Sequence, residues 1–130
     1  VKGHALYMKS LTTKPLDKTI VREARKQLKA AIVANPENML AHYEYVRTFR
    51  TLKDTPNKQA VASAKYALSY YKSKSFAPGN LSLAEVLIAA GDYDAARAPI
   101  EKAITWSSKD KTIARAKKLK VYLDKQTTEE

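Results

Sequence analysis

The sequence contains no cysteine and little glycine or proline: of its 130 residues, 3 are glycine and 5 are proline. The absence of cysteine excludes a disulfide framework, a thiolate zinc site and a cysteine nucleophile. It leaves the redox compartment open, because cytoplasm and periplasm are both compatible with a chain that has no thiol. The three glycines, Gly3, Gly79 and Gly91, are isolated from one another, so a glycine-rich phosphate loop is excluded as well.

Long apolar runs are also absent. No stretch approaches the ~20 apolar residues of a membrane-spanning helix, and the opening residues VKGHALYMKS contain no signal-peptide core. We therefore expect a soluble chain. It begins without methionine and inside a periodic segment, which indicates a piece of a longer protein.

Residues that commonly carry catalysis are scarce. The only two histidines, His4 and His42, do not have the spacing of a helical metal site. Asp92 and Asp94 suit a loop and a helix start better than general acid and base roles, and no serine lies in a recognisable nucleophile turn. We expect no catalytic residue, no metal site and no cofactor in this chain, and hence no enzymatic activity of its own.

Acidic residues are outnumbered by basic ones. Asp and Glu total 13 against 24 Lys and Arg, which gives a formal net charge of +11. The basic excess is concentrated in residues 1–30, with eight basic and two acidic side chains, and in residues 109–125, with seven and two. A charge of this sign favours an acidic partner without naming it.

Apolar residues recur at helical spacing throughout, which predicts an all-α fold. Four breaks divide the periodic segments: Asn35-Pro36, Thr55-Pro56, Pro78 and Gly91-Asp92. Thr55 is expected to cap the helix that Pro56 begins, and Gly91 is expected in a left-handed helix end before Asp92 caps the next helix. The predicted helices are 1–12, 17–34, 39–53, 56–73, 78–90, 93–106 and 110–125.

Small and apolar residues also recur with a longer period. Ala24, Ala60 and Ala96 stand 36 residues apart. Four further sets of three share this spacing and are Leu28, Ala64 and Ile100; Ala31, Ala67 and Ala103; Ile32, Leu68 and Ile104; Ala34, Tyr70 and Trp106. The first four positions of each unit form one apolar helical face, on which short side chains allow neighbouring helices to approach closely. We expect these residues, Tyr70 among them, to form the core between repeats.

The units resemble tetratricopeptide repeats. The segment NLSLAEVLIAAGDYDAARAPIEKAI carries the family signature, and AHYEYVRTF supplies the first helix of the preceding unit. The resemblance implies one domain of three helix pairs, about residues 1–36, 37–74 and 75–108, with a capping helix at 110–125. These pairs would stack into a right-handed superhelix. Pro99 departs from the pattern, because it lies inside a predicted helix that it is expected to kink.

In this family, ligands usually lie on the concave face, which the first helix of each pair lines. The resemblance implies a ligand-binding surface composed of Tyr43, Arg47, Arg50, Leu81, Glu85, Ile88 and Arg115. His4 and Tyr7 would extend it. The family's clamp for the carboxyl terminus of a chaperone is not supported, because the corresponding positions hold no lysine and asparagine pair.

This surface combines aromatic, arginine and apolar side chains, the residue types that dominate protein-interface energetics. We therefore expect a non-catalytic protein-interaction module with a protein or peptide partner. Two alternatives stay open for the function: binding of nucleic acid by the basic surface and the tyrosines, or a role as accessory domain of a larger enzyme. For the residues, the alternative is that Tyr43 and Leu81 pack in the core and the arginines are only solvated.

Overall fold

The computed structural model describes residues 2–12, 17–70 and 77–128, and these residues form seven α-helices without a strand. The helices are α1 (Lys2–Thr12), α2 (Lys18–Ala34), α3 (Met39–Leu52), α4 (Lys58–Tyr70), α5 (Ala77–Ala89), α6 (Tyr93–Trp106) and α7 (Asp110–Thr128). The predicted all-α fold is confirmed, and the helix limits agree within a few residues. The predicted extension of α4 to residue 73 lies outside the described residues.

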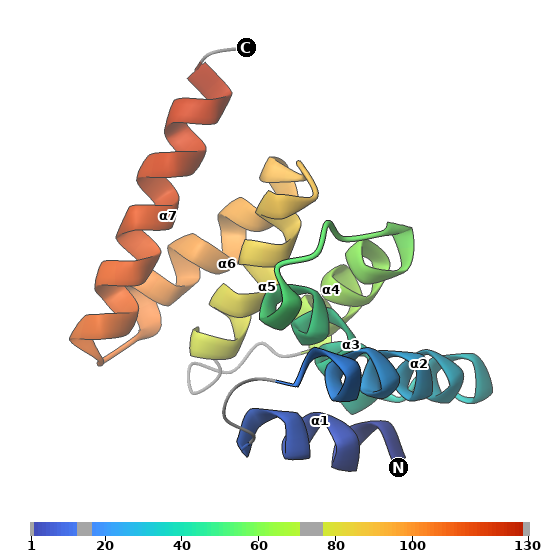
Figure 1. Ribbon diagram of the computed structural model, residues 1–130. Coiled ribbons are helices and arrows are strands. Elements are labelled where there is room, and N and C mark those ends of the chain that lie inside the picture. The colour runs from blue at the N-terminus through green and yellow to red at the C-terminus, as the bar shows by residue number, and fades with distance from the viewer. Residues whose placement is uncertain (1, 13–16, 71–76, 129–130) are drawn as a thin grey trace.

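The chain progresses from α1 at one end to α7 at the other, so the two termini lie far apart (Figure 1). Consecutive helices pack against each other as α1 with α2, α3 with α4, and α5 with α6. The second member of each pair also contacts the first member of the next, because α2 touches α3, α4 touches α5 and α6 touches α7.

Short polar side chains set the helix starts. Asp17 Oδ1 accepts the Thr19 N–H at 3.0 Å, and Asn38 Oδ1 accepts the Ala41 N–H at 3.2 Å. The predicted start at Thr55 and Pro56 is wrong by two residues. Asn57 lies immediately before α4, and its Oδ1 accepts the Ala60 N–H at 2.8 Å.

Among the helix ends that the structure describes, two adopt the left-handed backbone conformation. Gly91 has φ 83°, as predicted, and the Asp92 N–H donates to the Leu87 carbonyl at 2.9 Å. Lys53 adopts the same conformation after α3, with φ 56°, although it is not glycine. The Asp54 N–H donates to the Phe49 carbonyl at 3.0 Å, which fixes this turn.

The residues of the 36-residue period occupy the core in four of the five sets. Ala24, Ala60 and Ala96 are all 0% exposed, and the next three sets are buried or partly buried. The expectation for the fifth set is wrong: Tyr70 is 66% exposed. Tyr70 holds the fifth position of its unit, outside the apolar face that the first four positions form, and Ala34 at the same position of the first unit is exposed as well.

Helices α1 and α2 approach closely at Gly3. A Cβ added to Gly3 would lie 2.7 Å from Leu28 Cγ and 2.9 Å from the Leu28 backbone nitrogen. Only a residue without a side chain fits at this distance. In α6, the helix runs from Tyr93 to Trp106 without interruption, with Pro99 buried inside it, so the proline does not break it.

Asp92 gives a test of the cap at the start of α6. Its carboxylate accepts from the Ala95 N–H at 3.3 Å and pairs with Lys65 Nζ at 2.8 Å. The hydrogen bond from Lys65, assisted by Ala95, lowers the pKa of Asp92 below 3.8 against the opposing effect of burial. Asp92→Ala should lower the free energy of unfolding by about 1 kcal/mol at neutral pH.

The charge of Asp92 can be separated from its capping. Asp92→Asn keeps the cap but cannot ionise. A lowered carboxyl pKa gives stability that is present above the unfolded pKa and disappears as pH falls through the folded pKa. Urea unfolding should therefore show wild type a few tenths of a kcal/mol more stable than Asp92→Asn at about pH 7, with a smaller difference at about pH 3. A difference that is the same at both pH values would contradict the pairing with Lys65.

Candidate functional site

The odd-numbered helices lie next to one another in a row. Helix α1 contacts α3, α3 contacts α5, and α5 contacts α7. All seven predicted ligand-binding residues belong to this row. Three lie on α3, three on α5 and one on α7, in the order Tyr43, Arg47, Arg50, Leu81, Glu85, Ile88 and Arg115.

Glu85 joins three of these helices. Its Oε2 accepts from Arg50 Nε of α3 at 2.6 Å, and its Oε1 accepts from Arg115 Nε of α7 at 2.6 Å. The Arg115 guanidinium also lies 3.5 Å from Ser82 Oγ. The structure thus brings together three residues that the sequence analysis placed on one surface. Two guanidinium groups share one carboxylate, so the cluster keeps a net positive charge.

A second group lies between α1 and α3. The Arg47 guanidinium carbon is 5.4 Å from the centre of the Tyr43 ring and 5.6 Å from that of Tyr7, within the range of cation–π attraction. Burial raises the pKa of Tyr43 above 10.0, although the positive charge of Arg47 opposes this. Arg47 Nε is buried and has no hydrogen-bond partner. A buried donor of this kind is costly unless a partner satisfies it.

Two expectations for this surface are wrong. Leu81 is 0% exposed, because α3, α4, α6 and α7 all pack against α5 and leave its side chain no open side. Tyr7 is 1% exposed and therefore does not extend the surface, although its ring lies near the Arg47 guanidinium. Ile88 is partly buried and packs against the same core as Leu81. His4 is partly exposed, and its ring pairs with the buried carboxylate of Glu44.

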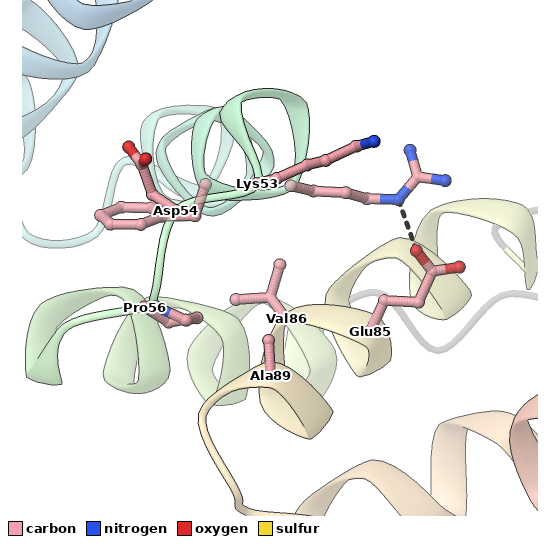
Figure 2. A pocket seen from close by; sticks show the side chains of 8 residues that line it. Lys53, Asp54, Pro56, Glu85, Val86 and Ala89 are labelled. Carbon is pink, nitrogen blue, oxygen red and sulfur yellow. Dashed lines mark hydrogen bonds and ion pairs between the residues drawn. The ribbon is translucent and has the colours of Figure 1, made fainter. Parts of the chain in front are cut away.

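A pocket of about 510 Å³ opens between the end of α3, the turn that follows it and the second half of α5 (Figure 2). We call it the α3–α5 pocket. Its lining is Phe49, Arg50, Lys53, Asp54, Pro56, Glu85, Val86 and Ala89. Figure 2 shows Val86 and Ala89 facing the cavity from α5, with the hydrogen bond to Glu85 at one side. The pocket therefore adjoins the Glu85 cluster.

Arg25 of α2 contacts two of the residues that line this pocket. Its guanidinium pairs with Asp54 Oδ2 at 2.9 Å and lies 3.8 Å from the centre of the Phe49 ring. Its Nε–H donates to Thr48 Oγ1 at 3.0 Å. The charge of Asp54 is thereby balanced by that of Arg25. Lys53 is exposed and forms no ion pair with any residue that the structure describes.

The α3–α5 pocket was not predicted from the sequence. Its turn depends on the left-handed backbone of Lys53, and that conformation gives no signal in the sequence when the residue is not glycine or asparagine. The charge of Arg25 could not be assigned to this site either, because Arg25 and Asp54 lie on different helix pairs.

Across the part of the chain that the structure describes, no group of three or more His, Asp or Glu residues is arranged to hold a metal ion. In the same residues, no helix has the length and apolar character needed to cross a membrane. In comparisons with known proteins, no protein-family model, curated protein or solved structure matches this chain.

Proposed function

We propose that this chain is a protein-interaction module that binds a peptide segment of a partner along the row of α1, α3, α5 and α7. The observation that carries the proposal is the cluster of Arg50, Glu85 and Arg115, which continues on α3 into Arg47 and Tyr43. Partly exposed arginine and tyrosine side chains, held in place by one another, are the residue types that anchor protein interfaces.

We also propose that the helix pairs of this chain form a tetratricopeptide-like array. The packing of α1 with α2, α3 with α4 and α5 with α6 supports repeated helix pairs, as does the burial of Ala24, Ala60 and Ala96. In such arrays each unit contacts mainly its neighbours, and the first helices together form an extended binding surface. α7 would then cover the last pair.

The expected partner segment is acidic. The net charge of +11 attracts negative groups over a distance, and the Glu85 cluster keeps an excess of guanidinium groups at short range. Arginine also binds carboxylates through two parallel hydrogen bonds, which fixes the orientation of a bound segment.

Substitutions of Tyr43 and Arg47 test the proposal. A binding peptide would be obtained by selection from a random displayed library with the whole chain as bait, then synthesised with a fluorescent label. Tyr43→Ala and Arg47→Ala should each weaken its binding about tenfold or more in fluorescence polarisation, while the circular dichroism spectrum stays helical.

Lys117→Glu and Lys118→Glu are the matched controls, because both lysines are exposed on α7. They should change affinity by less than about threefold, as expected of charges outside the interface. Loss of binding in the lysine variants alone would contradict the proposal and place the ligand on the basic face of α7.

Binding of nucleic acid is the competing function. Its support is the basic charge and the partial exposure of Tyr66, at 38%, and Tyr70, at 66%, whereas Tyr71 lies outside the described residues. Phosphate-driven affinity falls about a thousandfold or more between 50 and 200 mM salt when six or more phosphates are bound. We expect only weak binding of single-stranded oligonucleotides without sequence preference. A nanomolar complex at physiological salt would favour nucleic acid instead.

A further inference from the structure

We propose that the α3–α5 pocket receives an aliphatic or aromatic side chain of the partner peptide, and that Arg50 and Lys53 bind a carboxylate within two residues of that side chain. This inference rests on the proposed function, and it specifies which peptides are bound. It assigns a role to Lys53, Val86 and Ala89, which lie outside the predicted binding surface.

The apolar part of the pocket suits one side chain. Phe49, Pro56, Val86 and Ala89 line it, and its volume of about 510 Å³ is within the range of pockets that enclose small ligands. Removing an apolar side chain of the peptide from water against this lining favours binding.

The charged side chains at the rim of the pocket select the acidic residue of the peptide. Arg50 donates its Nε–H to Glu85, and its terminal amino groups form no hydrogen bond to any described residue, so they can donate to a ligand. The carboxylates of the rim are already paired, Asp54 with Arg25 and Glu85 with two arginines. The unpaired charge of Lys53 therefore dominates at the mouth of the pocket, and a ligand carboxylate complements it.

Contacts within the protein hold the lining of the pocket in place. Phe49 is held on one face by the Arg25 guanidinium and contacts the Tyr45 ring edge-on, with 5.3 Å between ring centres. Backbone hydrogen bonds from Lys53 to the Arg50 carbonyl and from Asp54 to the Phe49 carbonyl fix the turn. A site that needs no rearrangement loses less entropy on binding.

The peptide selection described above is the first test. The enriched sequences should share an apolar side chain with Asp or Glu within two positions of it. A consensus of basic residues, or of apolar residues without an acidic neighbour, would overturn the inference.

Ala89→Glu is the second test, because Ala89 is exposed on α5 and its side chain lines the pocket. The introduced carboxylate fills the mouth and repels the acidic peptide, so binding of the labelled consensus peptide should weaken tenfold or more. Ala30→Glu is the matched control, an exposed alanine on α2 outside the pocket, and it should bind as wild type does. Lys53→Asn should weaken binding about threefold to fivefold, because asparagine tolerates the left-handed backbone but removes the charge.

A double-mutant cycle connects the peptide to the pocket. Replacing the apolar residue of the peptide by alanine should weaken binding tenfold in wild type but hardly at all in Ala89→Glu, since that variant no longer uses the pocket. If Ala89→Glu and Lys53→Asn bind like wild type while Tyr43→Ala and Arg47→Ala do not, the inference is overturned and the proposed function stands. If all four variants bind like wild type, or no peptide is selected, both are overturned.

Discussion

Leu81→Ala is expected to lower the free energy of unfolding by about 2–5 kcal/mol. Leu81 is 0% exposed and belongs to an apolar cluster that includes Val46, Leu87 and Ile100. Truncation removes buried methyl groups and leaves a cavity, since the four helices around α5 cannot all close onto it. Urea unfolding monitored by circular dichroism measures the effect.

Leu40→Ala is the control for this substitution, because Leu40 is 46% exposed on α3. It should change stability by no more than about 0.5 kcal/mol. If Leu81→Ala instead leaves stability unchanged and weakens peptide binding, Leu81 lines the binding surface after all and the packing around α5 is wrong.

Ala60→Leu should lower the free energy of unfolding by about 1–3 kcal/mol. Ala60 is 0% exposed in the cluster of Leu28, Tyr45 and Phe49, so three additional carbon atoms have no space unless α4 moves. Thermal and urea unfolding would detect the loss. Ala62→Leu is the control on the same helix, where the side chain is exposed, and it should be neutral within about 0.5 kcal/mol.

The same enlargement at Ala24 and Ala96 extends this prediction to the 36-residue period. Each residue is 0% exposed on the second helix of its pair. If the helix pairs are equivalent units, all three leucine substitutions should be destabilising. A tolerated leucine at any one of them would show that the period does not correspond to equivalent packing.

The helix limits could be predicted because the residues that cap a helix act on neighbours close in the sequence. Gly91 and Asp92 end one helix and begin the next through contacts within a few residues, and both appear in the structure as expected. The burial of Ala24, Ala60 and Ala96 was predictable for a related reason, since the spacing of apolar residues shows which face of a helix is buried. Tyr70 is an exception because a shared spacing of 36 residues does not place a residue on the apolar face of its helix, and the fifth position of the unit lies outside that face.

The candidate site was predictable only in part. The resemblance placed Arg50, Glu85 and Arg115 on one surface, but their pairing depends on the register between α3, α5 and α7, which no single helix records. Leu81 lies one turn before Glu85, so the pattern assigned both to one face. The packing of four helices around α5 buries the apolar residue and leaves Glu85 only partly covered.

The most direct measurement of the peptide-binding surface is a titration of the ¹⁵N-labelled chain with the selected peptide, followed by amide and side-chain chemical shifts. We expect the largest changes at Tyr43, Arg47, Arg50, Glu85 and Arg115. Changes confined to the outer faces of α2, α4 and α6, or to Lys117 and Lys118 on α7, would contradict this expectation.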